Sequence, residues 1–272
     1  MKMDVDEIYS GVMSVLNSNR IARAPPTNLD ADVIKEIIRD REDGYLKFFV
    51  LWGGSKEGVY GDDADVKSLE HLIKFSEELD AQYVSPSDKW PNNRWYNRMH
   101  ILFCDMHHVI ANGIPYEETL EYFSSMIPLF NRTRLDDSYL LSSILDKDPE
   151  KYLGETYEYL GKAYEVPSAK IVLQNNESAR ALLADKAKKH SRLLLNGSRT
   201  VDSVVETYVQ VELYILTKIS KIFESSYPIF ISFSDPKIQR PIAEAANVPM
   251  LYLWSREGHH GEVPWYSSEN TR

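Results

Sequence analysis

Short apolar runs, separated by segments in which apolar and charged residues follow a helical spacing, dominate the pattern of the chain. The runs are nearly continuous in apolar character and rich in Val, Ile, Leu and aromatic residues, which is typical of strands buried on both faces of a sheet. Between them, apolar residues three and four positions apart predict helices over 65–80, 117–130 and 201–223. The predicted strands are 47–52, 100–104, 170–173, 192–195, 228–233 and 249–254.

This alternation of strands and helices favours a Rossmann-like α/β fold, with a mainly parallel, doubly wound sheet and helices on both faces. Two segments depart from it. Residues 85–97 are a loop rich in Pro, Asn and Trp, and residues 131–167 are charged and helix-prone. A chain of 272 residues can bury one large core. We therefore expect residues 1–272 to form a single Rossmann-like domain with a helical insertion at about 131–167.

Composition and charge mainly argue against certain partners, namely nucleic acids and membranes. Acidic residues outnumber basic ones by 41 to 31, and the net charge of −10 disfavours nucleic acid as a partner. The one basic concentration, 186–199, is typical of a solvated helix face and would be the RNA contact if there were one. No apolar stretch is long enough to cross a bilayer and the N-terminus does not resemble a secretory signal, so we expect a cytoplasmic protein without a membrane partner. The 17 tyrosines are typical of pockets and interfaces, which is compatible with a homodimer.

Polar residues able to take part in chemistry follow each predicted strand. In open α/β sheets, ligands bind beyond the carboxyl ends of the strands, so parallel strands would bring these residues to one edge. The alternative is a set of ordinary surface turns, but Lys, Asp, His, Asn and Arg favour a functional rim. The clusters are Gly53-Gly54-Ser55-Lys56, Asp105-Met106-His107-His108 with Asn112, Gln174-Asn175-Asn176, Asn196-Gly197-Ser198-Arg199, Ser234-Asp235-Pro236-Lys237 and Ser255-Arg256-Glu257.

The first cluster, Gly53-Gly54-Ser55-Lys56, has the features of an anion-binding loop. Glycines let the backbone approach a ligand closely, and successive N–H groups with Lys56 would bind a phosphate, carboxylate or carbonyl. The spacing differs from a Walker A loop and from GxGxxG, so no nucleotide cofactor is predicted. A plain turn after the strand is the alternative.

Asp105, His107 and His108 suggest a metal site at first sight. However, Asp105 and His107 would lie on one side of an extended strand end and His108 on the other, and no HExxH motif is present. We therefore expect no metal. A carboxylate that orients an imidazole or binds a substrate amine fits these residues better. The only cysteine, Cys104, lies in an apolar run and is expected to be a buried structural thiol.

Tyr208 and Glu212 are four residues apart on the apolar stripe of the longest predicted helix. An unpaired Glu is costly to bury on such a face. Either a cation such as Arg199 or Lys237 pairs with it, or it faces a pocket and binds a substrate amine. The sequence leaves both interpretations open.

Three stretches resemble the isocyanide synthases of the pyoverdine/dityrosine biosynthesis family. They are FVLWGGSK before an acid-led helix, HILFCDMHHVIANGIPYEETLEYFSSM, and ISFSDPK through VPMLYLWSREGHHGEVPWY. The resemblance implies a Rossmann-like fold and conversion of an amino acid's amine to an isonitrile, with a sugar phosphate as carbon donor. Lys56 would be the lysine of the family's first loop and Asp105 its strand-end acid. The chain departs from the family in the two histidines after Asp105 and in a shorter first loop.

A second likeness is to tRNA-dependent cyclodipeptide synthases, whose fold resembles the catalytic domain of class I aminoacyl-tRNA synthetases. The motif Tyr208-x-x-x-Glu212, on a helix that leads to a strand, is similar to their Tyr/Glu pair. Ser55 would then stand near their nucleophilic serine.

Together these features predict an isocyanide-synthase-like biosynthetic enzyme that acts on an amino acid or another small anionic metabolite, without a cofactor. The alternatives are a cyclodipeptide-synthase-like aminoacyl transferase that uses Ser55, and a non-catalytic small-ligand-binding protein. The predicted catalytic residues are Lys56, Asp105, His107 and Glu212. The predicted substrate-binding residues are Gly53, Gly54, Ser55, Asn112, Arg199, Tyr208, Asp235, Lys237 and Arg256.

Overall fold

The protein is described by a computed structural model that covers residues 4–40, 46–53, 63–83, 97–130, 137–145 and 167–254. These residues form a six-stranded sheet with the strand order β1-β6-β5-β2-β3-β4. Every pair of neighbouring strands is parallel except β1 and β6, which are antiparallel. The strands are β1 (Ala22–Thr27), β2 (Leu46–Trp52), β3 (Asn97–Phe103), β4 (Asp137–Leu140), β5 (Ile229–Ser232) and β6 (Met250–Leu253).

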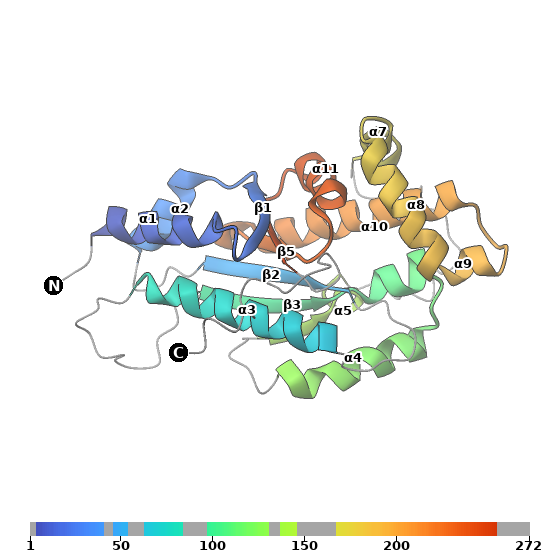
Figure 1. The fold of residues 1–272 in the computed structure, drawn as a ribbon, viewed down its shortest axis with the longest axis horizontal. Coiled ribbons are helices and arrows are strands. Elements are labelled where there is room, and N and C mark those ends of the chain that lie inside the picture. Colours follow the sequence, from blue (N-terminus) through green and yellow to red (C-terminus); the bar gives the residue numbers. More distant parts are fainter. Residues whose placement is uncertain are drawn as a thin grey trace.

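Both faces of the sheet are buried along β2, β3, β5 and β6, because alternate side chains of these strands enter different hydrophobic clusters. On β2, Phe48 and Val50 belong to one cluster, and Phe49 and Leu51 belong to the other. Figure 1 shows α3 and α10 on different sides of β2. The first cluster is covered by α1 (Val5–Leu16), α2 (Ala31–Arg39), α3 (Asp63–Ala81) and α4 (Tyr116–Phe130). The second is covered by α7 (Ala169–Gln174), α8 (Glu177–His190), α10 (Val201–Ile222) and α11 (Pro236–Ala246).

Four short helical elements complete the described chain: η1 (His107–Ala111), α5 (Leu141–Ile144), α9 (Arg192–Leu195) and η3 (Glu224–Ser226). This architecture confirms the predicted α/β class with a mainly parallel sheet and helices on both faces. The three predicted helices are confirmed as α3, α4 and α10, and four of the predicted strands are confirmed as β2, β3, β5 and β6. That residues 1–272 are a single domain stays a prediction.

Two predicted strands are wrong. Residues 170–173 lie in α7 and residues 192–195 form α9. Such short apolar runs fit a strand or one turn of a buried helix equally well, and periodicity alone does not separate the two. The polar clusters behind them therefore do not follow strands.

The segment 131–167 differs from its prediction where it is described. Residues 137–140 form β4, which pairs in parallel with β3, and a single helical turn, α5, follows. A strand therefore stands inside the expected helical insertion. Residues 131–136 and 146–166 lie outside the described residues, as does most of the predicted loop 85–97.

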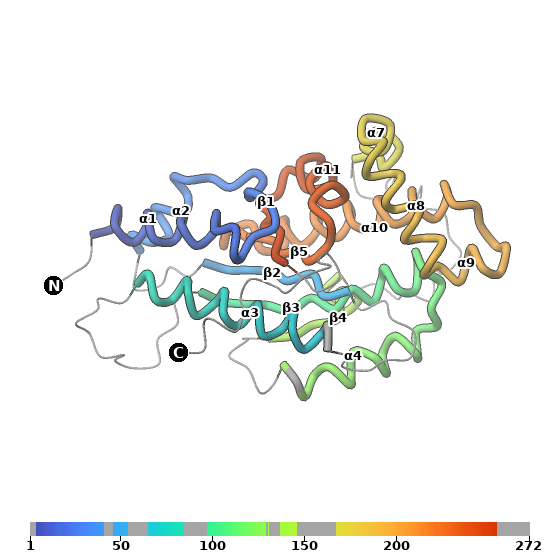
Figure 2. Tube along the Cα trace, in the orientation of Figure 1, coloured from blue at the N-terminus to red at the C-terminus, as the bar shows by residue number. Residues whose placement is uncertain are grey.

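The connection after β3 shapes the region where a ligand would bind. The chain leaves β3 directly into the π-helical turn η1, turns at Gly113 with a φ of 69°, and enters α4. Figure 2 shows this green segment meeting the segment that carries α8 and α9, where the Arg192 N–H donates to the Asn112 carbonyl at 2.9 Å. The turn thus brings α8 and α10 to the carboxyl end of the sheet.

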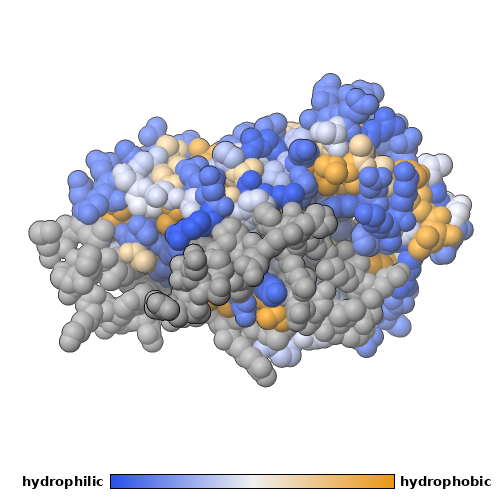
Figure 3. All heavy atoms as spheres, viewed as in Figure 1, coloured by the Kyte–Doolittle hydropathy of each residue, from blue (hydrophilic) through white to orange (hydrophobic). Residues whose placement is uncertain are grey.

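The described surface is mostly hydrophilic in the view of Figure 3. Small apolar areas lie toward the end of the molecule that carries α7 and α9, where Ile171 and Leu195 are exposed. Among the helices that the structure describes, none has the length and apolar character needed to cross a bilayer.

Candidate active site

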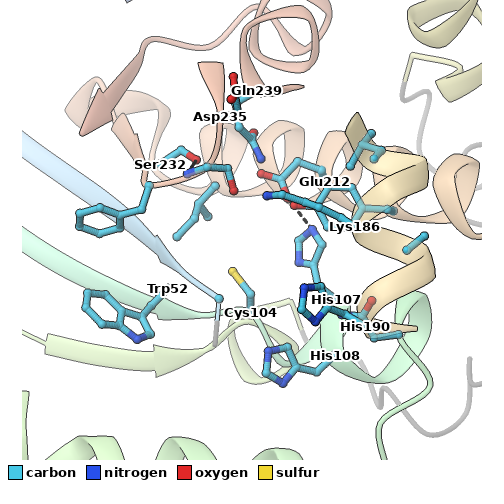
Figure 4. Close-up of a pocket in the computed structure, with 18 of the residues that line it drawn as sticks. Trp52, Cys104, His107, His108, Lys186, His190, Glu212, Ser232, Asp235 and Gln239 are labelled. Atoms are coloured by element: carbon cyan, nitrogen blue, oxygen red, sulfur yellow. Dashed lines mark hydrogen bonds and ion pairs between the residues drawn. The ribbon is translucent and has the colours of Figure 1, made fainter. Parts of the chain in front are cut away.

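A cavity of about 550 Å³ lies at the carboxyl ends of β2, β3 and β5. This is where ligands bind in open α/β sheets. Figure 4 shows side chains from the sheet, η1, α8 and α10 surrounding it. Its polar and aromatic lining consists of Arg23, Trp52, Asp65, Ser68, Cys104, His107, His108, Asn112, Tyr122, Lys186, Lys189, His190, Tyr208, Glu212, Ser232, Phe233, Ser234, Asp235 and Gln239.

An ion pair between His107 Nε2 and Glu212 Oε2 lies in the wall of this cavity. The two side chains are only 6% and 3% exposed. Figure 4 shows them pointing toward one another from η1 and α10. The second carboxylate oxygen of Glu212, Oε1, has no hydrogen-bond partner among the described residues. The same holds for both ring nitrogens of His107, so its contact with Oε2 is an ion pair without hydrogen-bond geometry. One oxygen of this buried carboxylate therefore faces His107 and the other is available to a ligand.

Tyr208 lies one turn before Glu212 on α10, which begins at the N-cap Thr200. Its ring centroid is 5.1 Å from that of His107. Burial and the negative charge of Glu212 raise the pKa of the Tyr208 phenol well above its ordinary value, although side-chain hydrogen bonds with Ser234 and Gln239 oppose the shift. Tyr208 therefore stays protonated at neutral pH and can donate a hydrogen bond.

His108 is buried next to His107 and is neutral. Burial, and then the positive charge of His107, lower its pKa to about 3. Its ring lies 5.1 Å from Phe123 and 6.0 Å from Tyr122, whose hydroxyl donates to Asp65 Oδ2 at 3.0 Å. The histidines of this turn therefore differ, because one faces a carboxylate and the other faces aromatic rings.

Cys104 lines the cavity at the end of β3. Burial, and then the negative charges of Glu212 and Asp105, raise the pKa of its thiol well above the ordinary value. A thiolate nucleophile is therefore disfavoured here.

Asp105 is fully buried and does not line the cavity. Its carboxylate accepts hydrogen bonds from the Met106 N–H at 3.0 Å, from the Ser142 N–H at 3.1 Å and from the Ser142 hydroxyl. Burial raises the pKa of Asp105, while these hydrogen bonds lower it. These contacts tie the end of β3 to α5, which is a structural arrangement.

Positive side chains line another wall of the cavity. Lys186, Lys189 and His190 belong to the last turns of α8. On the far side, Arg23 of β1 pairs with Asp235, the N-cap of α11, at 2.8 Å. Within the part of the chain that the structure describes, no three His, Cys, Asp or Glu side chains are grouped so that they could hold a metal ion.

The structure brings six of the predicted site residues to the cavity: Gly53, His107, Asn112, Tyr208, Glu212 and Asp235. It leaves Asp105, Arg199 and Lys237 away from it. Arg199 donates to Thr207 Oγ1 at 3.1 Å, and Lys237 is exposed on α11. Neither therefore pairs with Glu212, which was one of the two interpretations that the sequence left open; the residue that contacts its carboxylate is His107. Gly54, Ser55, Lys56 and Arg256 lie outside the described residues.

The expected geometry of Asp105, His107 and His108 was wrong, because the chain after β3 is helical and not extended. Both histidines therefore reach the cavity. Lys186, Lys189 and His190 were missed as site residues. A signal for them existed, since Leu183, Lys186, Ala187 and His190 share one helix face in a mixture that a fully solvated face does not show.

Comparisons with known proteins give no family for the chain. No protein-family model matches it, and no curated protein matches it. Among solved structures, it is similar to a tyrosyl-tRNA synthetase from Archaeoglobus fulgidus, complexed with L-tyrosine, at 11% identity and a TM-score of 0.46; the match covers 92% of this chain but 64% of the synthetase.

A second match is a CDPS from Fluoribacter dumoffii, at 12% identity and a TM-score of 0.43; it covers 76% of this chain and 90% of that one. A third is a cyclodipeptide synthase from Candidatus Glomeribacter gigasporarum bound to Phe-tRNAPhe. The latter has 10% identity and a TM-score of 0.43 over 86% of this chain and 98% of that one. None of these three structures is an isocyanide synthase. Because the TM-scores are below 0.5, these matches support no conclusion about function. A functional proposal has to rest on the residues of the cavity.

Proposed function

We propose that the protein is a biosynthetic enzyme that transfers an aminoacyl group to the amine of an amino-acid substrate, as the likeness of the Tyr208-x-x-x-Glu212 motif to cyclodipeptide synthases implies. The observation that carries this proposal is the buried carboxylate of Glu212, one oxygen of which has no partner among the described residues, in a cavity shared with Tyr208. A buried carboxylate is stabilised by a cation that donates hydrogen bonds to it. A substrate ammonium group supplies such donors.

The chemistry of the transfer fits these residues. The ammonium group loses a proton to the Glu212 carboxylate, and the amine nitrogen then attacks the carbonyl carbon of an aminoacyl ester. A C–N bond forms and the ester C–O bond breaks; the nitrogen loses its second proton, which passes to the leaving oxygen, and the first proton leaves Glu212 for solvent. When the acceptor amino acid is itself held as an ester, the free amine of the dipeptide attacks that ester in the same way, which closes the ring of a cyclic dipeptide and releases the second hydroxyl. Tyr208, which remains protonated, donates a hydrogen bond to the substrate or to the oxyanion.

Lys186, Lys189 and His190 support an aminoacyl-tRNA as the ester donor. Cationic side chains along the cavity wall would contact the phosphates near the end of the tRNA that carries the ester. The net charge of −10 opposes broad binding of nucleic acid, so the proposed contact is confined to this wall. The sequence likeness assigns the acyl-accepting hydroxyl to Ser55, which lies outside the described residues.

The surroundings of Asp105 favour this proposal over isocyanide synthesis. The isocyanide-synthase resemblance gives Asp105 an active-site role, yet its carboxylate accepts three hydrogen bonds from Met106 and Ser142 and does not line the cavity. Binding an amine there would break contacts that join β3 to α5. Glu212, in contrast, has one oxygen without a hydrogen-bond partner among the described residues.

The test is incubation of the purified protein with a complete tRNA aminoacylation mixture, followed by mass spectrometry for cyclic dipeptides. We expect a cyclic dipeptide with the wild-type protein and none with Glu212→Gln or Ser55→Ala. Absence of any dipeptide, together with no loss of aminoacyl groups from tRNA, would overturn the proposal. A parallel incubation with aromatic amino acids and a sugar phosphate would overturn it in favour of the first resemblance if an isonitrile formed.

A further inference from the structure

We propose that His107 is a positioning residue, whose imidazole engages one carboxylate oxygen of Glu212 so that the other faces the substrate ammonium group. This inference rests on the proposed function of the same cavity and adds a residue to it. Its basis is the asymmetry of Glu212: Oε2 pairs with His107 Nε2, and Oε1 has no hydrogen-bond partner in the described part of the chain.

Burial makes this pairing important. A carboxylate whose side chain is only 3% exposed is costly to bury unless a positive or hydrogen-bonding partner stabilises it. Arg199 bonds to Thr207 and Lys237 is exposed, so neither is that partner. His107 is the partner, and it comes from η1, which packs directly against α10.

The groups next to the pair are neutral. On α10, Tyr208 is neutral because burial, and then the charge of Glu212, raise its pKa. Beside His107, the thiol of Cys104 is neutral because burial, and then the charges of Glu212 and Asp105, raise its pKa, and His108 is neutral because burial, and then the charge of His107, lower its pKa. Among the described residues, the cavity also carries Lys186, Lys189 and His190 on the wall formed by α8, the paired Arg23 and Asp235, and Asp65.

The position of His107 also limits how Glu212 can move. Its ring contacts Tyr208, with the centroids 5.1 Å apart and the planes inclined by 55°, while its nitrogen contacts Glu212. A single imidazole therefore spans the two α10 side chains that the proposed reaction uses. Figure 4 shows this arrangement, with the dashed line joining His107 to Glu212.

A direct test follows the ring nitrogens by NMR of protein with isotope-labelled histidine, assigned with His107→Ala and His108→Ala. Glu212→Gln removes the carboxylate that His107 contacts, so we expect it to shift the ring-nitrogen resonances of His107 much more than those of His108. Resonances of His107 that Glu212→Gln leaves unchanged would overturn the inference. This result is independent of turnover, so it stands apart from failure of the proposed reaction.

A second test uses the aminoacyl-transfer assay. His107→Ala should lower kcat/KM by about 10²-fold, as expected when a reacting group loses its orientation. Added imidazole should restore much of this loss, because it can fill the vacated space and pair with Glu212, whereas it should not rescue Glu212→Gln. Activity of His107→Ala equal to that of the wild type, or a loss that imidazole leaves unchanged, would contradict the role.

Two further variants separate positioning from folding. His71→Ala removes another buried histidine, which lies on α3 away from the cavity and contacts the Ile21 carbonyl at 3.0 Å. We expect its kcat/KM to stay within a few-fold of the wild-type value and to be insensitive to imidazole. His107→Gln keeps a hydrogen-bond donor and fills most of the space, so it should retain more activity than His107→Ala even if the alanine variant folds poorly. Equal activity of the two folded variants would argue against the inference.

Discussion

Glu212 illustrates how a single buried side chain constrains its neighbours. Its carboxylate is held among apolar residues of α10 and adds to burial, the larger cause, in raising the pKa of both Tyr208 and Cys104. The same charge thus helps to keep each of these groups in its protonated form. A change at Glu212 would therefore alter the protonation of several groups at once and not only remove one contact.

The energetic coupling of His107 and Glu212 can be measured by a double-mutant cycle. His107→Ala and Glu212→Ala each leave a buried charge without its partner, which costs up to about 3–5 kcal/mol in a sealed core and less beside a cavity that admits water. The double variant should be more stable than the sum of the single effects predicts, by about 0.5–3 kcal/mol. Urea unfolding of the four proteins tests this. Strictly additive losses would show that the two side chains do not interact.

The pKa of His108 predicts a dependence of stability on pH. The folded protein keeps His108 neutral down to about pH 3, whereas the unfolded chain protonates it near the ordinary value of 6.5. The unfolded state therefore binds more protons between these values, and the free energy of unfolding falls as the pH falls from 6.5 toward 3. At about pH 5 the loss should be about 2 kcal/mol, at about 1.4 kcal/mol per pH unit.

His108→Asn should remove this contribution while leaving that of His71, whose pKa burial also lowers. The comparison requires unfolding curves for both proteins at neutral pH and near pH 5. If the two proteins lose the same stability on acidification, His108 is not held neutral in the folded state.

Part of the site could be predicted from residues alone. Tyr208 and Glu212 were predicted because an acid and a phenol four positions apart on an apolar stripe must face either a partner or a pocket. The partner of Glu212 could not be predicted, because it comes from η1 and depends on how the chain leaves β3. Tertiary packing decides which residue far away in the sequence pairs with Glu212, and no local pattern around His107 indicates that pairing.

At the scale of elements, the two predicted strands that are wrong are the shortest of the apolar runs. The runs at 170–173 and 192–195 are helical in α7 and α9. Conversely, β1 contains Pro25 and Pro26, which argue against a strand, and β4 has a polar, half-exposed pattern. The long helices were predicted correctly because their periodicity extends over several turns.

The turn after η1 gives a prediction about one glycine. Gly113 has a φ of 69°, and a Cβ there would lie 2.6 Å from the Leu193 side chain. Gly113→Ala should therefore combine backbone strain of about 1–3 kcal/mol with a steric clash that displaces α9. Gly197 has a similar φ of 67°, but no atom of the described residues lies within 4 Å of a Cβ placed there, so Gly197→Ala reports the strain alone.

Thermal unfolding of the two glycine variants would separate these effects. Gly113→Ala should be the less stable, and it should also reduce aminoacyl transfer, because α9 follows the lysines of α8 directly. Equal stability of the two variants would mean that Leu193 moves aside at no cost.

At the scale of the whole molecule, the acidic balance and the positive wall of the cavity make opposite predictions about tRNA. If the wall supplies the contact, the double variant Lys186→Ala, Lys189→Ala should bind tRNA more weakly. The slope of the logarithm of the binding constant against the logarithm of the salt concentration should also become less steep, by roughly 1.5 to 2. Lys188→Ala is the matched control, because Lys188 is exposed, pairs with Asp185 and does not line the cavity.

Filter binding across a series of salt concentrations measures both quantities. If alanine substitution changes this slope equally at Lys186, Lys188 and Lys189, the attraction is diffuse and not a defined contact. A protein that fails to bind tRNA even at low salt would point to a different ester donor.

The prolines of β1 have a consequence for how molecules meet in solution. β1 ends the strand order, so one side of its backbone faces away from the sheet. Pro25 and Pro26 offer no N–H to an incoming strand, and the Pro25 carbonyl already accepts a hydrogen bond from Arg240 at 2.9 Å. This edge is therefore closed to strand addition, which protects a largely parallel and apolar sheet from edge-to-edge aggregation.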